Sequence, residues 1–414
     1  MNPHKKLAIQ RRLLLACMTV ATALIAGLAG ILATLFLHAV QYIFLEPARS
    51  PQPWVYPLWL AGAGFFAGLL WWWIRRKPLH TLNPVIAKES VNFPVWRTIL
   101  DAALQIFIVG AGASIGREVA PRQFAGVLVH RLGLQTRLSD RERTLLVAAG
   151  AGAALAAVYN TPLAGIAFTL WVTIHRVDSE SVLVSSVSSL GAVALARLVV
   201  GKQAYYVYPP TELTAQEWVW AGVCIVLSAG AGYLFSLLCT WGKKAKVPGP
   251  WLPWTVALAL GLSGVLIGFH ADVAGNGVLI LQNGFDGNIG LAEFAVLLLL
   301  KPLATVFTLR SGAVGGVLTP ALAFGASLGG VVALISHNPQ LVPVFMVISA
   351  GSVLSVSENS AFFGGVFILE LVHAPLHLWL PVICASLGAV CVVRGVEKLA
   401  FIRRNDSLSV SSTH

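Results

Sequence analysis

Residues Gly116–Gln123 read GREVAPRQ, and they place an arginine and a glutamate side by side in an otherwise apolar part of the chain. A glycine precedes this pair, and Pro121 follows it. Ionisable groups inside a membrane span are costly, so they usually serve a function. We interpret the interruption as the start of a broken helix whose free N-terminal amides point at an anion. Glu118 is then placed to compete with that anion for one position.

The rest of the chain has the composition of an integral membrane protein. Of its 414 residues, 57% are hydrophobic and 11% are charged, and the mean hydropathy is +0.78. A soluble protein carries about a quarter charged residues. The 39 glycines and 21 prolines favour closely packed and interrupted helices over a bundle of straight spans. Apolar runs near the roughly 20 residues that span a bilayer lie at Leu13–Leu37, Trp54–Ile74, Ile99–Ile115, Val182–Val200, Trp218–Leu238, Trp251–Phe269, Leu291–Leu309 and Leu341–Val356.

The net charge of +11 follows the pattern of a membrane protein and not that of a nucleic-acid-binding protein. The basic residues lie in short loops and tails, as orientation signals do, which predicts that both termini are cytoplasmic. No basic face interleaved with aromatic residues is present, so we expect no nucleic acid partner. The cysteines lie singly, without metal-ligand spacing, and we expect no metal or cofactor. The basic groups are Lys5, Lys6, Arg11, Arg12, Arg75, Arg76, Lys77, the loop Arg131–Arg143, Lys243, Lys244, Lys246, Arg403 and Arg404.

The second half of the chain repeats features of the first half. Arg310–Pro320 reads RSGAVGGVLTP, a second glycine-rich turn that opens a helix, and Asn359–Glu370 parallels Asn160–Leu170. Interrupted segments in corresponding places of two halves are typical of inverted repeats, with the binding site between them at the midplane. We therefore predict a cytoplasmic tail (1–12), a first membrane repeat (13–200), a connecting loop (201–216), a second membrane repeat (217–395) and a cytoplasmic tail (396–414).

Four stretches resemble the CLC family of chloride channels and chloride/proton antiporters. GREVAPRQ is similar to the family's Gly-Arg-Glu-Gly-Pro, with one residue more before the proline. Ala148–Gly165 resembles the stretch that ends Phe-Asn-Ala-Pro-Leu-Ala-Gly, and Ser311–Pro320 resembles Ser-Gly-Ala-Pro-Gly-Gly-Ile-Phe-Ala-Pro. Leu79–Pro84 matches Gly-Ser-Gly-Ile-Pro only by its offset, because both glycines are absent. Together these stretches cover nearly the whole chain.

The resemblance implies an all-α polytopic membrane protein with a CLC-like fold. This fold has two inverted-topology repeats of tilted, partly re-entrant helices, about 18 in all. It also implies a homodimer with one pore in each subunit, surrounded by membrane lipid. No regulatory domains of the cystathionine-β-synthase type follow the second repeat, so we expect a prokaryotic member of a plasma membrane.

The resemblance also implies an anion site and a gate. Glu118 would be the external gate, blocking the anion path when ionised and leaving it when protonated or displaced. Arg117 more often braces such a turn, because charges at this depth pair locally, and Arg122 adds positive potential near the external mouth or forms an ion pair. The anion-binding groups would be the hydroxyl of Thr81, unless 79–84 is an ordinary polar loop, and backbone groups at Gly116, Arg117, Val119, Gly316, Val317 and Leu318.

Two features of the family pattern are missing from this chain. The inner glutamates that pass protons to the gate correspond to Trp171 and Val172, and neither residue can carry a proton. The tyrosine of the inner gate has no counterpart near Pro375 or Leu376. Substitutes for a proton relay would be His175, His373, His377, Glu180, Glu358 and Glu370.

The function that follows is transport of chloride, or of a similar monovalent anion, through a pore in each subunit that Glu118 gates. Glu118 favours a link to protons, whereas the missing inner glutamates favour an uncoupled channel. Nitrate, bromide and fluoride remain alternative substrates, because selectivity depends on site size and donor placement. A secondary transporter of an organic anion on another inverted-repeat fold would lack convergent glycine-rich turns. A membrane enzyme would need paired histidines or a Ser/His dyad, and no such spacing is present.

Overall fold

The computed structural model describes residues 3–44, 55–77, 79, 82, 94–209 and 218–411. Within these ranges the chain is helical, and ten helices are long and apolar enough to cross a membrane. The predicted all-α polytopic architecture is therefore confirmed. The α-helices are α1 (Pro3–Phe44), α2 (Val55–Ile74), α4 (Val95–Ala111), α5 (Val119–Gly133), α6 (Asp140–Tyr159), α7 (Pro162–Ala167), α8 (Ser179–Val200), α9 (Trp218–Lys243), α10 (Leu252–Phe269), α11 (Val278–Phe285), α12 (Leu291–Arg310), α13 (Leu318–Ile335), α14 (Val342–Ser357), α15 (Phe363–Leu371) and α16 (Leu376–Ser411).

Three candidate spans were not among the apolar runs of the sequence. These are α6, α13 and the part of α16 from Leu376 to Lys398. Helix α6 is rich in alanine and glycine and begins with charged residues, which holds its hydropathy to 1.2. Small residues are less apolar than leucine but allow helices to approach closely. The run at Ile99–Ile115 corresponds to α4, which has only 17 residues.

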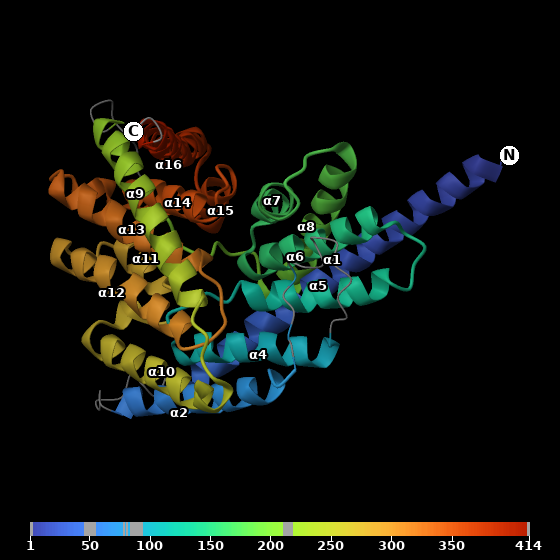
Figure 1. Ribbon diagram of the computed structural model, residues 1–414, viewed down its shortest axis with the longest axis horizontal. Coiled ribbons are helices and arrows are strands. Elements are labelled where there is room, and N and C mark those ends of the chain that lie inside the picture. Colours follow the sequence, from blue (N-terminus) through green and yellow to red (C-terminus); the bar gives the residue numbers. More distant parts are fainter. Residues whose placement is uncertain are drawn as a thin grey trace.

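The helices form two groups that meet at the centre of the molecule (Figure 1). Helices α1 and α4–α8 gather on one side, and α9 and α11–α16 gather on the other. Helix α2 lies beside α10, so an early helix packs on the later half of the chain. Small residues allow this contact, since a Cβ atom on Gly68 would lie 2.6 Å from Cα of Pro253.

The most deeply buried spans lie where the site is built. In α6 and α14, 89% of the apolar window is buried, and in α13 83% is buried, against 33% in α9. Glycine again sets the spacing, because a Cβ atom on Gly329 of α13 would lie 2.1 Å from the carbonyl oxygen of Phe345 in α14. These central helices can therefore hold polar groups away from both lipid and bulk water.

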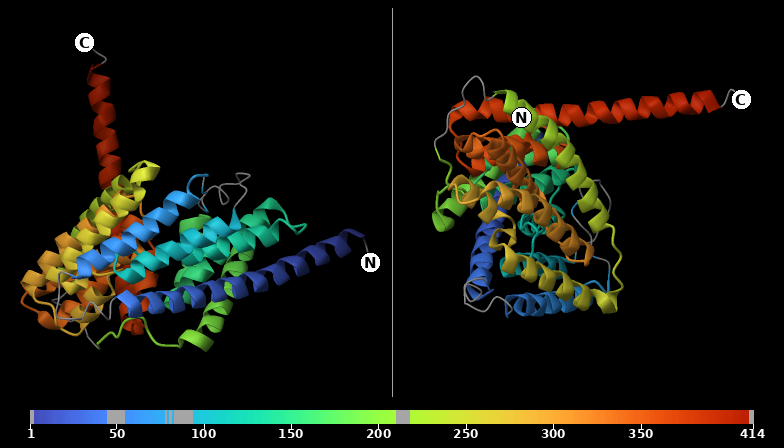
Figure 2. Two further views of the ribbon diagram at one scale, coloured as in Figure 1. Left: turned by 90° about the horizontal axis from the view of Figure 1, so that it is seen from below. Right: turned by 90° about the vertical axis from the view of Figure 1, so that its left-hand side faces the viewer.

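The first and last helices are longer than a bilayer requires. At 1.5 Å per residue, the 42 residues of α1 extend about 63 Å, about twice the thickness of a hydrocarbon core. One end of α1 and the C-terminal part of α16 project beyond the other helices (Figure 2). Arg11 in the projecting part of α1 forms a 2.8 Å ion pair with Glu142, in the first turn of α6. The described residues of the two predicted tails, 3–12 and 396–411, therefore continue the terminal helices.

Candidate anion site

Two broken helices from opposite halves of the chain meet at their glycine-rich turns. The amide of Gly116 donates to the carbonyl of Gly316 at 2.8 Å, and the amide of Gly316 donates to the carbonyl of Gly116 at the same distance. Each turn leaves the preceding helix through a glycine in the left-handed region, Gly112 with φ +120° and Gly312 with φ +91°. Residues with a Cβ atom rarely adopt this conformation. The local sequence thus lets both turns form, and the fold joins them.

The helices that follow these turns begin in the same way. Helix α5 starts at Val119 and has Pro121 in its third position, and α13 starts at Leu318 and has Pro320 in its third position. Proline is tolerated in a first turn because an amide there has no partner within the helix. The other first-turn amides remain available to an anion or a carboxylate.

The carboxylate of Glu118 occupies the place where these helix ends converge. Glu118 is 0% exposed, and its Oε1 accepts a hydrogen bond of 2.6 Å from the amide of Leu318. The hydroxyls of Thr319 and Tyr159 donate to Oε2 at 3.4 and 3.5 Å. An acidic side chain of the first half therefore binds the first turn of a helix from the second half.

Only glycine leaves room for this carboxylate. A Cβ atom on Gly116 would lie 2.0 Å from Oε2 of Glu118, and one on Gly316 would lie 2.0 Å from Oε1. The carboxylate is thus held between the two glycines that form the backbone bridge. Its oxygens stand where a small anion would meet the same helix ends.

Arg117 lies beside the site and is 3% exposed. Its Cζ atom lies 5.2 Å from the ring centre of Tyr159 and 5.4 Å from that of Tyr205. Its Nε and Nη1 atoms are buried without a hydrogen-bond partner, and no carboxylate of the described residues forms an ion pair with it. Two aromatic faces lie against the guanidinium where a carboxylate was expected, and the role of Arg117 in bracing the turn stays a prediction. The guanidinium keeps its positive charge close to the site.

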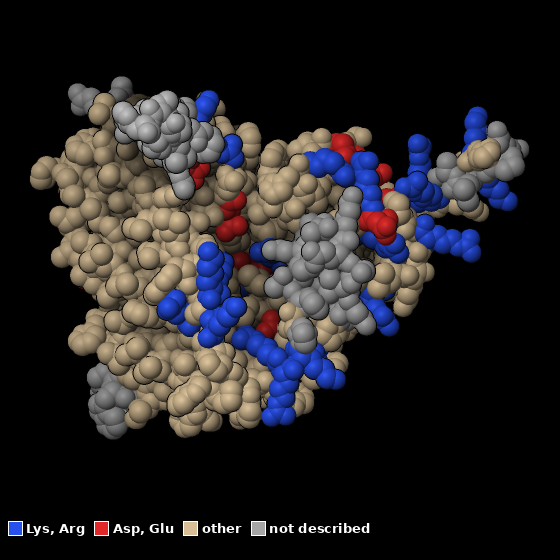
Figure 3. Space-filling model, viewed as in Figure 1, with Lys and Arg blue, Asp and Glu red and all other residues tan. Residues whose placement is uncertain are grey.

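A cavity of about 760 Å³ extends from Glu118 to Lys243 and Glu358. Figure 3 shows a hollow on this face of the molecule, with acidic side chains inside it and basic side chains around it. The guanidinium of Arg122 lies 4.2 Å from the ring centre of Phe168 in the wall of this cavity. Other lining residues are Leu82, Val119, Gln123, Ala151, Val172, Thr173, His175, Val314, Gly315, Gly316, Val317 and Leu318.

Comparison with known proteins places this arrangement in a family. The sequence model of the voltage gated chloride channels matches residues 63–394. The chain belongs to this family. A ClcB-like protein from Ralstonia nicotianae is 29% identical over 381 residues, which cover 85% of this chain and 88% of that protein. The H⁺/Cl⁻ exchange transporter ClcA of Vibrio parahaemolyticus is 25% identical over 402 residues, which cover 91% of this chain and 86% of that protein.

Solved structures show the same CLC fold. A slow cyanobacterial Cl⁻/H⁺ antiporter matches with a TM-score of 0.78 and 19% identity, and the match covers 92% of this chain and 95% of the antiporter. A CLC-type fluoride/proton antiporter matches with a TM-score of 0.77 and 21% identity, over 95% and 97% of the two chains. The predicted CLC-like fold and family membership are confirmed.

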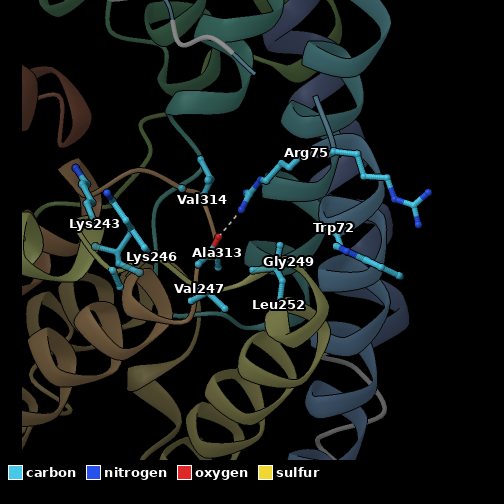
Figure 4. A pocket seen from close by; sticks show the side chains of 14 residues that line it. Trp72, Arg75, Lys243, Lys246, Val247, Gly249, Leu252, Ala313 and Val314 are labelled. Atoms are coloured by element: carbon cyan, nitrogen blue, oxygen red, sulfur yellow. Dashed lines mark hydrogen bonds between the residues drawn. The ribbon is translucent and has the colours of Figure 1, made fainter. Parts of the chain in front are cut away.

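A second, basic pocket of about 610 Å³ adjoins the cavity of this CLC-family chain. Both are lined by Lys243, and the second pocket adds Arg75, Arg76 and Lys246. Arg75 reaches across it and donates to the carbonyl of Gly312 at 2.8 Å (Figure 4). The residues that line this pocket include no carboxylate. It therefore surrounds the approach to the second glycine-rich turn with positive charge.

The structure brings together all but one of the residues that the sequence predicted for the anion site. The turns that hold Gly116, Arg117, Val119, Gly316, Val317 and Leu318 converge around Glu118. Thr81 lies outside the described residues. Sequence reasoning did not select Tyr159 or Thr319, although Thr319 stands in the first turn of the helix that receives Glu118.

The substitutes considered for a proton relay are not equally placed. His175 and Glu358 line the cavity, whereas Glu370 accepts from the amides of Leu163 and Ala164 at 3.0 and 2.7 Å. His373, His377 and Glu180 are not among the lining residues of the cavity. Arg122 lies in the same cavity as Lys243. Trp171, at the position of an inner glutamate, packs against Phe362 with ring centres 5.3 Å apart.

Proposed function

We propose that this chain carries chloride, or a similar small monovalent anion, across the plasma membrane, and that Glu118 is the gate. The observation that carries the proposal is the bond from the amide of Leu318 to the carboxylate of Glu118 between Gly116 and Gly316. The helix ends that surround this carboxylate, with the amide of Leu318 bound to it, are suited to hold a halide, because each helix N-terminus carries a partial positive charge of about +0.5. Partial charges bind an anion without trapping it, as conduction requires.

Protonation of Glu118 would open the site. A neutral side chain no longer competes for the amides, so each proton bound to Glu118 favours an anion at the same position. The names of the related proteins support this link, since the Vibrio relative is an H⁺/Cl⁻ exchange transporter. An uncoupled channel is the alternative, because Trp171 and Val172 carry no proton. The fluoride/proton antiporter among the similar structures makes fluoride a substrate to test beside chloride.

The proposal includes the orientation and assembly of the protein. Both termini face the cytoplasm. Arg11, near the N-terminus, pairs with Glu142 at the start of α6, beside the basic loop Arg131–Arg143. Short basic loops mark the cytoplasmic side of a membrane protein. The chain acts as a transport protein and not as an enzyme, in a homodimer with one pore in each subunit. Thr81 supplies a hydroxyl to the anion from the inner side.

The test is a flux measurement on liposomes that contain the purified full chain. Chloride efflux is followed with an ion-selective electrode, and proton movement is recorded in the same vesicles. In Glu118→Gln we expect proton movement to be abolished and the chloride rate to change at least several-fold, because the side chain can no longer ionise. Glu180→Gln in α8 is the control and should behave like the parent. If Glu118→Gln moves both protons and chloride at the rates of the parent, the gate is refuted. If vesicles with the parent protein do not leak chloride, the transport of chloride is refuted.

A further inference from the structure

We infer that Glu358 is the carboxylate that exchanges protons between the inner solution and Glu118. The inference rests on the proposed function and selects one residue from the six substitutes for a proton relay that the sequence offers. Glu118 is fully buried, so a proton can reach it only through a polar path. Among the residues that line the 760 Å³ cavity, Glu118 and Glu358 are the carboxylates.

The cavity can hold the water that such a transfer needs. At about 30 Å³ per water molecule, its volume has room for roughly 25 waters. Gln123, Thr173 and His175 offer polar groups along its wall. A proton leaves the carboxyl group of Glu358, passes along hydrogen-bonded water and binds an oxygen of Glu118. The ionised Glu358 then takes a new proton from the inner solution.

The charges that face Glu358 suit a group that exchanges its proton. Glu358 follows α14 and shares the cavity with two cations, Lys243 of α9 and Arg122 of α5. No ion pair within 4 Å joins Glu358 to either cation in the described part of the chain. The carboxylate is thus attracted by both cations but tied to neither. His175 lines the same cavity.

The remaining neighbours explain why the segment is held in place. Arg394 of α16 donates to the side chain of Asn359 at 3.0 Å, next to Glu358. Phe362, four residues further along, packs against Trp171. Helix α13, which also packs on α14, has no ionisable side chain. The segment with Glu358 therefore lies against the position where the resemblance expects an inner glutamate.

This placement provides a way to couple anions and protons. An anion in the cavity is drawn by Arg122 and Lys243, the same cations that face Glu358. It repels an ionised Glu358 and so favours the protonated form. An anion in the cavity thus raises the fraction of Glu358 that carries a proton ready for transfer to Glu118.

The experiment compares Glu358→Gln with Glu180→Gln in the liposome assay. We expect Glu358→Gln to keep chloride flux within about threefold of the parent and to lose proton movement at least tenfold, whereas Glu180→Gln keeps both. Chloride flux reports that the variant is folded. Glu358→Asp keeps a titratable group and should restore at least a third of the proton movement, which also tests the idea if the glutamine variant does not fold.

Three outcomes would overturn the inference and leave anion transport intact. In the first, Glu358→Gln moves protons at the parental rate. In the second, Glu180→Gln loses proton movement while Glu358→Gln keeps it. In the third, the parent protein passes chloride without moving protons. Absence of chloride flux in the parent protein would instead refute the proposed function.

Discussion

Substitution of Gly316 by alanine tests whether the carboxylate of Glu118 occupies the space between the two turns. The new Cβ atom would lie 2.0 Å from Oε1 of Glu118 and 2.1 Å from its Cδ atom. Cβ atoms essentially never approach another heavy atom within 3.0 Å, so the carboxylate must move by about 1.0 Å (3.0 minus 2.0). A shift of this size breaks the 2.6 Å bond from the amide of Leu318.

The loss can be expressed as a change in the occupancy of the closed gate. A hydrogen bond to a charged group contributes about 1.5–3 kcal/mol, and about 1.4 kcal/mol is a factor of ten in an equilibrium. Gly316→Ala should therefore reduce the population in which Glu118 is seated on Leu318 by about 10- to 150-fold. We expect chloride-driven proton movement to fall at least tenfold, and the pH dependence of chloride flux to flatten.

The assay combines flux in liposomes with thermal unfolding in detergent. Gly230→Ala is the matched control, because a Cβ atom at Gly230 of α9 meets nothing within 4 Å. The double variant Glu118→Ala/Gly316→Ala removes the group with which the new methyl collides. Its Tm should recover toward that of Glu118→Ala, so the two substitutions should not be additive. A Gly316→Ala protein with parental coupling and parental Tm would refute the reasoning.

Two further predictions concern weaker contacts. Thr319→Val and Tyr159→Phe each remove a hydroxyl that lies 3.4–3.5 Å from Glu118, at the limit of hydrogen bonding. Each substitution should therefore change the coupling of protons to chloride by less than about threefold. A tenfold loss of coupling in the flux assay would contradict this. Asp178→Ala removes the side chain that caps α8 by accepting from the amide of Ser181 at 2.9 Å and should cost about 1 kcal/mol of stability. This amide holds the pKa of Asp178 below its usual value. The stabilisation by the ionised cap is therefore complete above pH ~4 and is lost as pH falls through the folded pKa of Asp178. The Tm difference between the parent and Asp178→Ala should shrink over the same pH range. A Tm difference that does not change with pH would exclude the cap.

The sequence alone determined the class of the protein and the position of its broken helices. An 11% share of charged residues requires a membrane environment, because so little polar surface cannot cover a soluble protein of this length. Glycine and proline around Glu118, and again around Gly316, mark where helices stop and restart, since their backbone properties are local. Hydropathy did not reveal α6, because its alanines and glycines serve close packing more than contact with lipid.

Only the tertiary structure decided which distant residues share one space. The bridge between Gly116 and Gly316, the bond from Leu318 to Glu118 and the cavity that joins Glu118 to Glu358 all link the two halves of the chain. No periodicity encodes such contacts, because they depend on how closely glycine-lined helices pack against one another. The local sequence of this chain therefore indicates where the anion site begins. Which residues surround the charged groups of that site is decided by the packing of the two halves against each other.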